Sequence, residues 1–412
     1  MEILYAICCG LDVHKDSITA CLRRLGAGGQ GRQELRTVGT TTAELLTLLD
    51  WLVAAGCTHV AMESTGVYWK PVFNILEGHF QQVLVVNAQH MKALPGRKKD
   101  TLDAEWIAQL LQHGLLRGSF VPPAPIRELR EATRYRKQVI RTRADEANRI
   151  QKLLEGANLK LGSVATDILG GSGRAMLTAL VHGETDPTAL ARLAKGRLRK
   201  KHPQLVAALT GCISPVQRTL LGQQLAHVTY LDHAIAELDT LIASLMAPYQ
   251  AEATRLRTVT GIATRTAETL IAELGADMAV FPSDRHCASW AALCPGHDES
   301  AGKRRSGKTR KGSPWLRAAL IEAAWANTRT RGYLATQYRR VARRRGKKKA
   351  LVAVGHSILV IAYHILKDAT TYHDLGQDYF DKRDGARLQH RLIARLEALG
   401  LRVTVEPALQ AA

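Results

Sequence analysis

The first 120 residues alternate between short apolar runs and longer stretches with apolar residues at helical spacing. The short runs predict buried or half-buried strands, at residues 3–13, 17–22, 34–38, 58–62 and 83–86. The longer stretches predict helices, at residues 42–53, at 68–76 and from residue 100 to about Gly114. Three strands followed by helix, strand, helix, strand and helix is the element order of a mixed α/β domain.

The pattern changes after a group of prolines at positions 122, 123 and 125, which predicts a domain boundary. Residues 127–155 predict a long charged helix. Residues 216–249 carry apolar positions that alternate between steps of three and four, with one irregular step between Val228 and Leu231. This spacing is typical of a coiled coil with a stutter. The seam could pair with a second chain or form a hairpin with residues 127–155, and the pattern does not choose between them.

The remaining chain predicts mainly helices. We expect an α/β domain at 1–120, a helical coiled-coil and dimerisation region at 121–252, a compact unit at 253–345 and a helical extension at 346–412. The apolar run 351–366 contains His356 and His364 and predicts a buried helix, because it is too short and too polar to span a membrane. No secretory signal is recognised, so we expect a cytoplasmic protein without a membrane partner.

Charge is concentrated in one place. The chain has a formal net charge of +20, and residues 303–349 contain 17 Lys and Arg residues but only one acid, Glu322. Such a stretch repels itself unless a polyanion is near, which favours a nucleic-acid partner over a merely solvated face. A smaller basic cluster lies at residues 192–201. Aromatic residues make up only 5% of the chain, which disfavours a base-stacking surface.

Four acids stand where a metal site could form. Asp12 ends the first strand, Glu63 follows the fourth, and Asp100 and Asp103 open a helix with a spacing that places both on one face. Each could instead be a turn or helix-capping residue. Together they have the layout of an RNase-H-like nuclease, in which carboxylates hold Mg²⁺ or Mn²⁺ for phosphoryl transfer. The seven cysteines include no CxxC pair, so neither a zinc site nor a disulfide framework is predicted.

Two further motifs could contact nucleic acid. Residues 259–263, with Gly261 at their centre, resemble the turn of a helix-hairpin-helix motif, although a plain helical hairpin would have the same pattern. Ser300 lies in a glycine-containing basic loop and could attack a phosphate, with Ser306 as a second candidate. The residues alone favour an ordinary loop serine, because no base is seen beside it. The cations that could bind phosphate there are Lys303, Arg304, Arg305, Lys308, Arg310 and Lys311.

These motifs, in this order, resemble the DEDD-type insertion-sequence transposases, the IS-one-ten family. The matching segments are GLDVHK, AMESTG, GRKKDTLDAEWIAQLL, RIQKLLEGANLKL, GIATRTAETLIAELG and ESAGKRRSGKTRKGSPWLR. The resemblance covers roughly residues 5–175 and 253–345. It implies a RuvC-like N-terminal domain of RNase-H fold, a coiled-coil segment and a mainly helical C-terminal transposase domain.

The same resemblance implies roles for particular residues. The family's four metal-binding acids correspond to Asp12, Glu63, Asp100 and Asp103, and its nucleophilic serine to Ser300, just before Ala301-Gly302-Lys303. Family members recombine donor and target DNA under the guidance of a structured bridge RNA. They act as dimers or tetramers with a composite site between protomers, in the bacterial cytoplasm and associated with the nucleoid.

Two other functions remain open from the sequence. A metal-dependent junction resolvase would use water as the nucleophile, and Ser300 would only contact DNA. A non-catalytic nucleic-acid-binding protein would tolerate loss of the acids. Strand exchange through a serine ester would need no ATP, since such an ester conserves the phosphodiester energy.

Overall fold

The computed structural model of the protein describes residues 2–25, 31–64, 66–87, 103–296, 298–300, 303–310 and 312–405. Its chain divides into two compact units, Met1–Pro122 and Pro123–Ala412. The boundary lies within the proline-rich stretch. The finer division into four domains stays a prediction.

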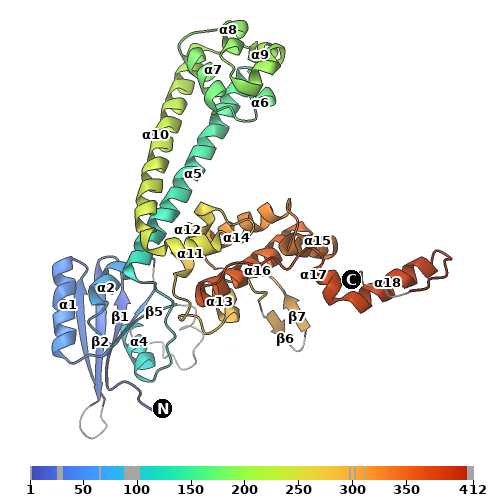
Figure 1. Cartoon of the computed structure of the whole chain (residues 1–412). Helices are drawn as coiled ribbons and strands as arrows, with labels where there is room; N and C mark the ends of the chain where they lie inside the picture. The colour runs from blue at the N-terminus through green and yellow to red at the C-terminus, as the bar shows by residue number, and fades with distance from the viewer. Residues whose placement is uncertain are drawn as a thin grey trace. The chain divides into compact units, whose positions relative to one another are not determined.

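The first unit is a five-stranded mixed sheet with helices on both faces (Figure 1). Its elements are β1 (Ile7–Val13), β2 (Ser17–Leu25), β3 (Gly31–Gly39), α1 (Thr42–Ala54), β4 (His59–Glu63), α2 (Trp69–Leu76), β5 (Gln82–Val86) and α4 (Asp103–Gln112). The strand order is β3-β2-β1-β4-β5; β1–β2 and β2–β3 are antiparallel, whereas β1–β4 and β4–β5 are parallel. The predicted order of strands and helices is confirmed, and it is consistent with an RNase-H-like fold.

The two faces of this sheet have separate cores. Residues at alternate positions of β1, such as Cys9 and Leu11, pack against α1 and α2. On the opposite face Cys8 packs with Ile107 and Leu111 of α4. Helix α1 begins with a capping box, in which the hydroxyl of Thr41 and the carboxylate of Glu44 satisfy each other's backbone amides.

The first strand is shorter than its apolar run predicted. The expected strand covered 3–13, whereas β1 begins at Ile7. The amides of Leu4 and Tyr5 instead donate to the carbonyl of Gln112 at the end of α4. The backbone of this segment thus pairs with the end of a helix and not with a strand, and the side chain of Leu4 is 63% exposed.

The second unit contains two long helices that form an antiparallel hairpin, α5 (Ala124–Gly156) and α10 (Pro215–Leu245) (Figure 1). α10 begins with a capping box between Ser214 and Gln217. Leu221, Val228 and Leu231 of the predicted seam are buried. α10 packs on α5 of the same chain, which is the hairpin alternative. Pairing of the seam with a second chain stays a prediction.

Buried ion pairs tie the base of this hairpin to the helices that follow it. Arg136 is only 4% exposed, and its guanidinium donates to Asp239 of α10 at 2.7 Å and to Glu268 at 2.5 Å. Partial burial acts to raise the pKa of Asp239, but hydrogen bonds from Arg136 and Arg265 outweigh it and hold that pKa below its ordinary value. A lowered carboxyl pKa stabilises the fold at neutral pH, and this contribution disappears as the pH falls below about 4.

Replacing Arg136 by Leu is expected to lower the free energy of unfolding of the second unit by about 3–5 kcal/mol, because Glu268 would stay largely buried without its partner. Urea denaturation followed by far-UV circular dichroism measures this loss. Arg141→Gln, an exposed site on the same helix, is the matched control and should change stability by less than about 0.5 kcal/mol. Equal effects of the two variants would mean that the buried pairs contribute nothing beyond surface charge.

A small helical domain, residues 157–214, connects the far ends of the hairpin, and we call it the tip (Figure 1). Its elements are α6 (Leu161–Val164), α7 (Gly171–Val181), α8 (Pro187–Arg192), η1 (Gly196–Lys201) and α9 (His202–Leu209). Leu177, Leu190 and Leu205 form its core together with Ile150 of α5 and Val228 of α10. The tip is therefore fixed to the hairpin by a shared hydrophobic core.

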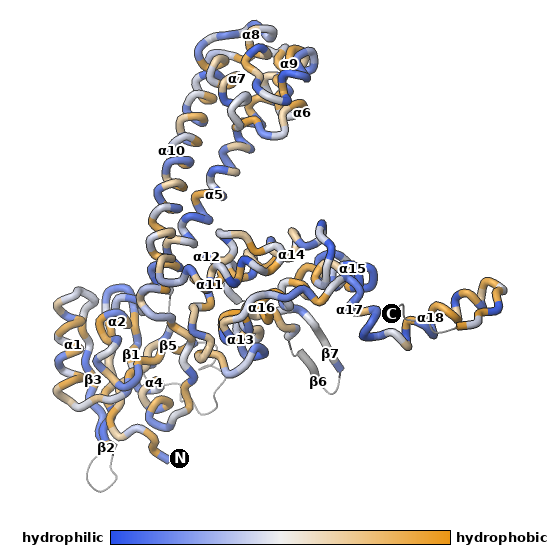
Figure 2. Tube along the Cα trace, in the orientation of Figure 1, coloured by the Kyte–Doolittle hydropathy of each residue, from blue (hydrophilic) through white to orange (hydrophobic). Residues whose placement is uncertain are grey.

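The rest of the second unit is a layer of helices with one small hairpin of strands. Its elements are η2 (Ala247–Tyr249), α11 (Gln250–Leu256), α12 (Thr264–Leu274), α13 (Asp284–Trp290), β6 (Asp298–Ser300), β7 (Lys303–Ser306), α14 (Pro314–Asn327), α15 (Tyr333–Arg345), α16 (Lys347–Asp368), α17 (Tyr379–Arg383) and α18 (Gly385–Glu397). Figure 2 shows α15 as largely hydrophilic, in agreement with its many arginines.

Helix α16 lies at the centre of this layer and packs on α11, α13, α14 and α15. The predicted apolar helix is confirmed, and its residues Ile358 and Leu359 are fully buried. Within the described residues it is the one helix long and apolar enough to cross a membrane by length and composition, a test that core helices also pass. In contrast, α18 has no buried residue.

Candidate functional site

Two of the predicted acids lie at the carboxyl ends of neighbouring parallel strands. β1 pairs with β4 so that Leu11 is opposite Met62, and the next residues are Asp12 and Glu63. Side chains alternate between the faces of a strand. Ala61, two residues before Glu63, packs on the α4 side of the sheet. Asp12 and Glu63 therefore project from the same edge and toward the same face.

Helix α4 brings a third acid, Asp103, toward this edge. Its last residue, Gln112, accepts hydrogen bonds from the amide of Leu4, ahead of β1, whereas Ala104 in its first turn lies over Gly10. The helix thus runs antiparallel to β1, and Asp103 at its first turn lies toward the carboxyl end of that strand. The contact with the sheet is very close, because a Cβ on Gly10 would lie 2.4 Å from the carbonyl oxygen of Ala104.

The chemistry of these residues suits a hard divalent cation, since carboxylate oxygens are the donors that Mg²⁺ and Mn²⁺ prefer. Asp12 is half-buried, and His14 Nε2 lies 3.2 Å from its Oδ2. Asp100, the fourth predicted acid, lies outside the described residues. Among those that are described, no three His, Cys, Asp or Glu side chains come together as a formed metal site. The structure thus places three acids at one edge without joining them into a coordination sphere.

The predicted serine lies in the β6–β7 hairpin of the second unit. Ser300 ends β6 and pairs with Lys303, the first residue of β7, while Ser306 pairs with Asp298 at the opposite end. The backbone thus puts Ser300 beside the turn and Ser306 beside the base. Arg310 fixes the base by donating to the Ser289 hydroxyl of α13 at 2.7 Å.

Of the predicted phosphate-binding cations, Arg304 and Arg305 continue β7, and Lys308 and Arg310 follow it. Lys311 falls outside the described residues.

A basic cavity of about 770 Å³ lies next to the base of this hairpin. Among the described residues, four cations and no acid line it: Lys308, Arg317, Lys348 and Lys349. Val352 and Ala353 of α16 supply an apolar wall, and Arg317 donates to the Thr309 hydroxyl at 2.9 Å. The arrangement can hold backbone phosphate and cover part of a sugar or base.

Sequence reasoning did not single out three residues of this cavity, Lys348, Lys349 and His356. The two lysines belong to the basic stretch 303–349, but they reach the hairpin only because α16 folds back across the unit. Burial lowers the pKa of His356, while Asp284 acts in the opposite direction, so this imidazole is neutral at physiological pH. No sequence signal distinguished His356 from an ordinary core histidine.

The turn at Gly261 joins α11 to α12, as a helix-hairpin-helix motif requires. Gly261 has a φ of +90°, a conformation that favours glycine. Its Cα faces α14, where an added Cβ would lie 2.5 Å from the carbonyl oxygen of Ala323. Asn327 secures the turn by donating to the carbonyl of Thr260 at 2.6 Å. Contact of Gly261 with nucleic acid stays a prediction.

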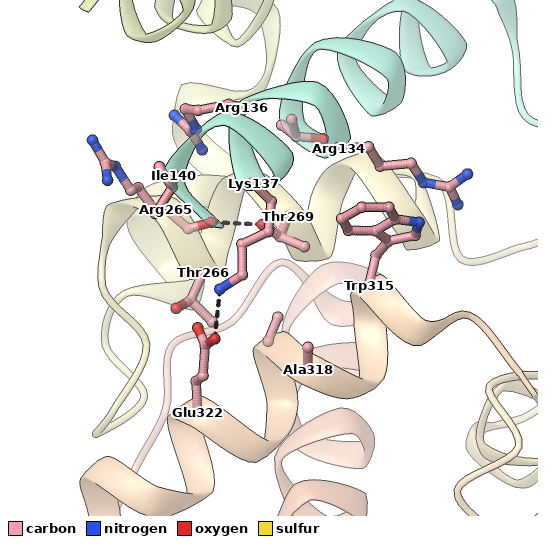
Figure 3. Close-up of a pocket in the computed structure, with 12 residues that line it drawn as sticks. Arg134, Arg136, Lys137, Ile140, Arg265, Thr266, Thr269, Trp315, Ala318 and Glu322 are labelled. Carbon is pink, nitrogen blue, oxygen red and sulfur yellow. Dashed lines mark hydrogen bonds and ion pairs between the residues drawn. The ribbon is translucent and has the colours of Figure 1, made fainter. Parts of the chain in front are cut away.

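A second cavity of about 220 Å³ lies between α5, α12 and α14 (Figure 3). Lys137 reaches across it to Glu322, with Nζ 2.5 Å from Oε1, and Arg134 beside Trp315 pairs with the buried Glu273. Arg136 and Arg265, which complete its charged lining, are also paired with acids. These paired cations hold α5, α12 and α14 together, so we assign this cavity a structural role and not a binding role.

Two known protein families match the chain. Residues 9–159 match a family described as transposase, of the DEDD type of IS110 elements, and residues 253–339 match one described as the transposase IS116/IS110/IS902 family. Together the matches cover more than half of the 412 residues. No curated protein matches the chain. The sheet edge with Asp12, Glu63 and Asp103, which we call the acidic edge, lies within the first match, and the β6–β7 hairpin with Ser300 lies within the second. The chain belongs to the IS110 family of transposases, which are DNA-processing enzymes.

Proposed function

We propose that the protein is an RNA-guided recombinase that cuts and rejoins donor and target DNA through a serine ester. The observation that carries this proposal is the pairing of two sites in one chain. Asp12, Glu63 and Asp103 lie toward one sheet edge, and Ser300 lies on a hairpin beside a cavity whose described lining contains four cations and no acid. Its membership of a transposase family makes DNA the substrate.

The acidic edge would bind the metal that stabilises negative charge on the reacting phosphate. Asp12, Glu63, Asp100 and Asp103 would hold one or two Mg²⁺ or Mn²⁺ ions. A bound ion would polarise a phosphoryl oxygen and stabilise the charge that develops on it. The strands hold Asp12 and Glu63 at fixed positions, and α4 positions Asp103 through its close contact with Gly10.

The serine provides the covalent step. Ser300 Oγ attacks a DNA phosphorus, so an Oγ–P bond forms while a bond from phosphorus to a deoxyribose oxygen breaks. The serine hydroxyl loses its proton and the departing deoxyribose oxygen gains one. In the rejoining step a DNA hydroxyl attacks the serine ester and releases Ser300. Lys308 and Arg317 of the basic cavity are suited to bind the adjacent phosphates.

A guide RNA would determine which DNA sequences the protein recombines. The residues around the hairpin are cations suited to phosphate, and aromatic residues are few. A surface of this kind recognises the shape and charge of a nucleic acid, whereas base pairing between guide and DNA reads sequence. We propose a structured bridge RNA as that guide, and a dimer or tetramer of the chain as the active form.

The test uses purified protein with Mg²⁺, the RNA flanking the element, and labelled donor and target DNA, resolved on a denaturing protein gel. A labelled band at the mass of the protein is expected from the wild type. It should disappear in Ser300→Ala and persist in Ser306→Ala, the matched change in the same hairpin.

Other outcomes would overturn parts of the proposal. Cleaved DNA without protein-linked label would favour a resolvase that uses water. Adduct lost in Ser306→Ala but kept in Ser300→Ala would move the nucleophile to the base of the hairpin. Equal yields with and without the RNA would remove the guide.

A further inference from the structure

The tip carries a charge cluster that the proposed function does not use. Residues 192–201 contain six cations and no acid: Arg192, Lys195, Arg197, Arg199, Lys200 and Lys201. All six are exposed, and none of them forms an ion pair with the described residues, which include the whole tip. Neither family match includes them, since the first ends at residue 159 and the second begins at 253.

Several cations on the long hairpin and near the tip are instead paired with acids. At the base of the hairpin Arg136 and Lys137 bind acids, and near the tip Arg174 pairs with Asp232. The acids of the tip itself are occupied by backbone groups, as when Asp186 caps α8 by accepting from two amides. Six unpaired like charges in ten residues repel one another, and a polyanion would relieve that repulsion.

The cluster also lines a cavity of about 540 Å³. Lys195, Arg197 and Lys201 contribute to its lining, and so do Gly170–Gly173 at the start of α7. The first turn of α7 has no side-chain cap, so no side chain of the tip accepts from its amides there. One acid, Asp167, lies in the lining, and its Oδ1 accepts from the amide of Leu169.

We propose that the tip is a second nucleic-acid-binding surface, and that its cavity seats backbone phosphate of DNA or RNA. The cavity alone would fit a small phosphate compound. The cluster, however, includes Arg192, Arg199 and Lys200, which do not line the cavity. A charge surface larger than the cavity fits an extended phosphodiester chain better than a small anion.

The surface on the tip lies far from the base of the hairpin. α5 has 33 residues, so the tip lies about 50 Å along the hairpin from its base. The core shared with Leu154 and Leu221 fixes the tip to both long helices. A nucleic acid bound there would be held at a set distance from the rest of the second unit.

The first test changes Arg192, Lys195, Arg197 and Lys200 to Gln in the full-length protein. None of these four side chains makes a hydrogen bond to a described residue, so the fold should tolerate their loss. Binding of a DNA duplex and of an RNA hairpin is measured by fluorescence anisotropy over a range of salt concentrations. The salt slope for the DNA duplex should fall by about 3.6, since each of the four lost contacts to B-form phosphate removes about 0.9.

The matched control changes four other exposed cations, Arg141, Lys152, Arg387 and Arg391, and should leave the slope within about one unit of the wild type. A fall with DNA alone assigns the surface to DNA, and a fall with RNA alone assigns it to RNA. Equal slopes for the tip variant and the control, with both probes, would overturn the proposal.

A second test separates binding from folding. Nothing lies within 4 Å of a Cβ added at Gly171, so a side chain fits there. Gly171→Asp should preserve or raise stability, because an acid suits the first turn of a helix, yet it should weaken binding about fivefold by repelling phosphate. The isosteric Gly171→Asn should bind like the wild type. Equal binding by the two variants would exclude phosphate at the cavity, whatever the result of the serine-adduct experiment.

Discussion

Replacing Asp12 by Asn is expected to abolish both DNA cleavage and strand exchange while leaving DNA binding intact. Asn keeps the shape of the side chain but loses the negative charge that would hold a divalent cation beside Glu63. A bound metal contributes several kcal/mol to phosphoryl transfer, so the rate should fall at least about 10³-fold. The change acts on a water-using and on a serine-using reaction alike, and its effect does not depend on which serine reacts.

The measurement is the rate of cleavage of labelled DNA under single-turnover conditions, with binding followed separately. Asp16→Asn is the matched control, because Asp16 is an exposed carboxylate three residues beyond the end of β1. The control should stay within about twofold of the wild type. A fully active Asp12→Asn variant would remove the acidic edge from the reaction and leave the chain with the serine alone.

Replacing Gly10 by Ala is expected to destabilise the first unit by about 3 kcal/mol, at the upper end of ordinary overpacking. The added Cβ would lie 2.3 Å from the backbone nitrogen of Ala108 and 2.4 Å from the carbonyl oxygen of Ala104. Backbone atoms of a helix cannot rotate away, so α4 must shift. Asp103 moves with it, and a displacement of about 1 Å can cost roughly 100-fold in rate.

Urea denaturation and the single-turnover cleavage rate measure the two effects on the same preparation. Gly31→Ala provides the control, since a Cβ there meets nothing within 4 Å on strand β3. If Gly10→Ala were as stable and as active as Gly31→Ala, α4 would not lie against β1 as closely as described.

Sequence periodicity predicted local structure well and long-range contacts poorly. The order of strands and helices in the first unit followed from apolar runs alone, because each run must be buried on one face. The start of β1 was misplaced: the strand begins at Ile7, and the amides of Leu4 and Tyr5 bind the end of α4 instead of a neighbouring strand. Periodicity cannot tell a strand from a segment that covers a helix end.

The partner of a helix is likewise invisible in its own pattern. The seam of α10 predicted a coiled coil, but only the structure identifies α5 as the neighbour. The same limit applies to the basic cavity, where Lys348 and Lys349 lie far along the sequence from Lys308. Residue type predicted a phosphate-binding region, while the fold of α16 decides which cations share it.

The acids illustrate a third limit. Their positions at strand ends and at a helix start were visible in sequence, and the topology puts Asp12 and Glu63 on adjacent strands. The sequence did not show that Gly10 allows α4 to pack closely against β1. Gly10 carries no chemistry of its own, and its importance follows only from the distance between two backbones.

The antiparallel hairpin has a consequence for how such an enzyme can change over time. α5 leaves the base of the second unit and α10 returns to it, so the chain passes out and back at one place. The tip and the two long helices can therefore vary in sequence and length without changing the rest of the fold. Removing one heptad from each helix would bring the tip about 10 Å closer to the base of the hairpin. Exchanging residues 157–214 would replace the tip and leave the acids and the serine unchanged.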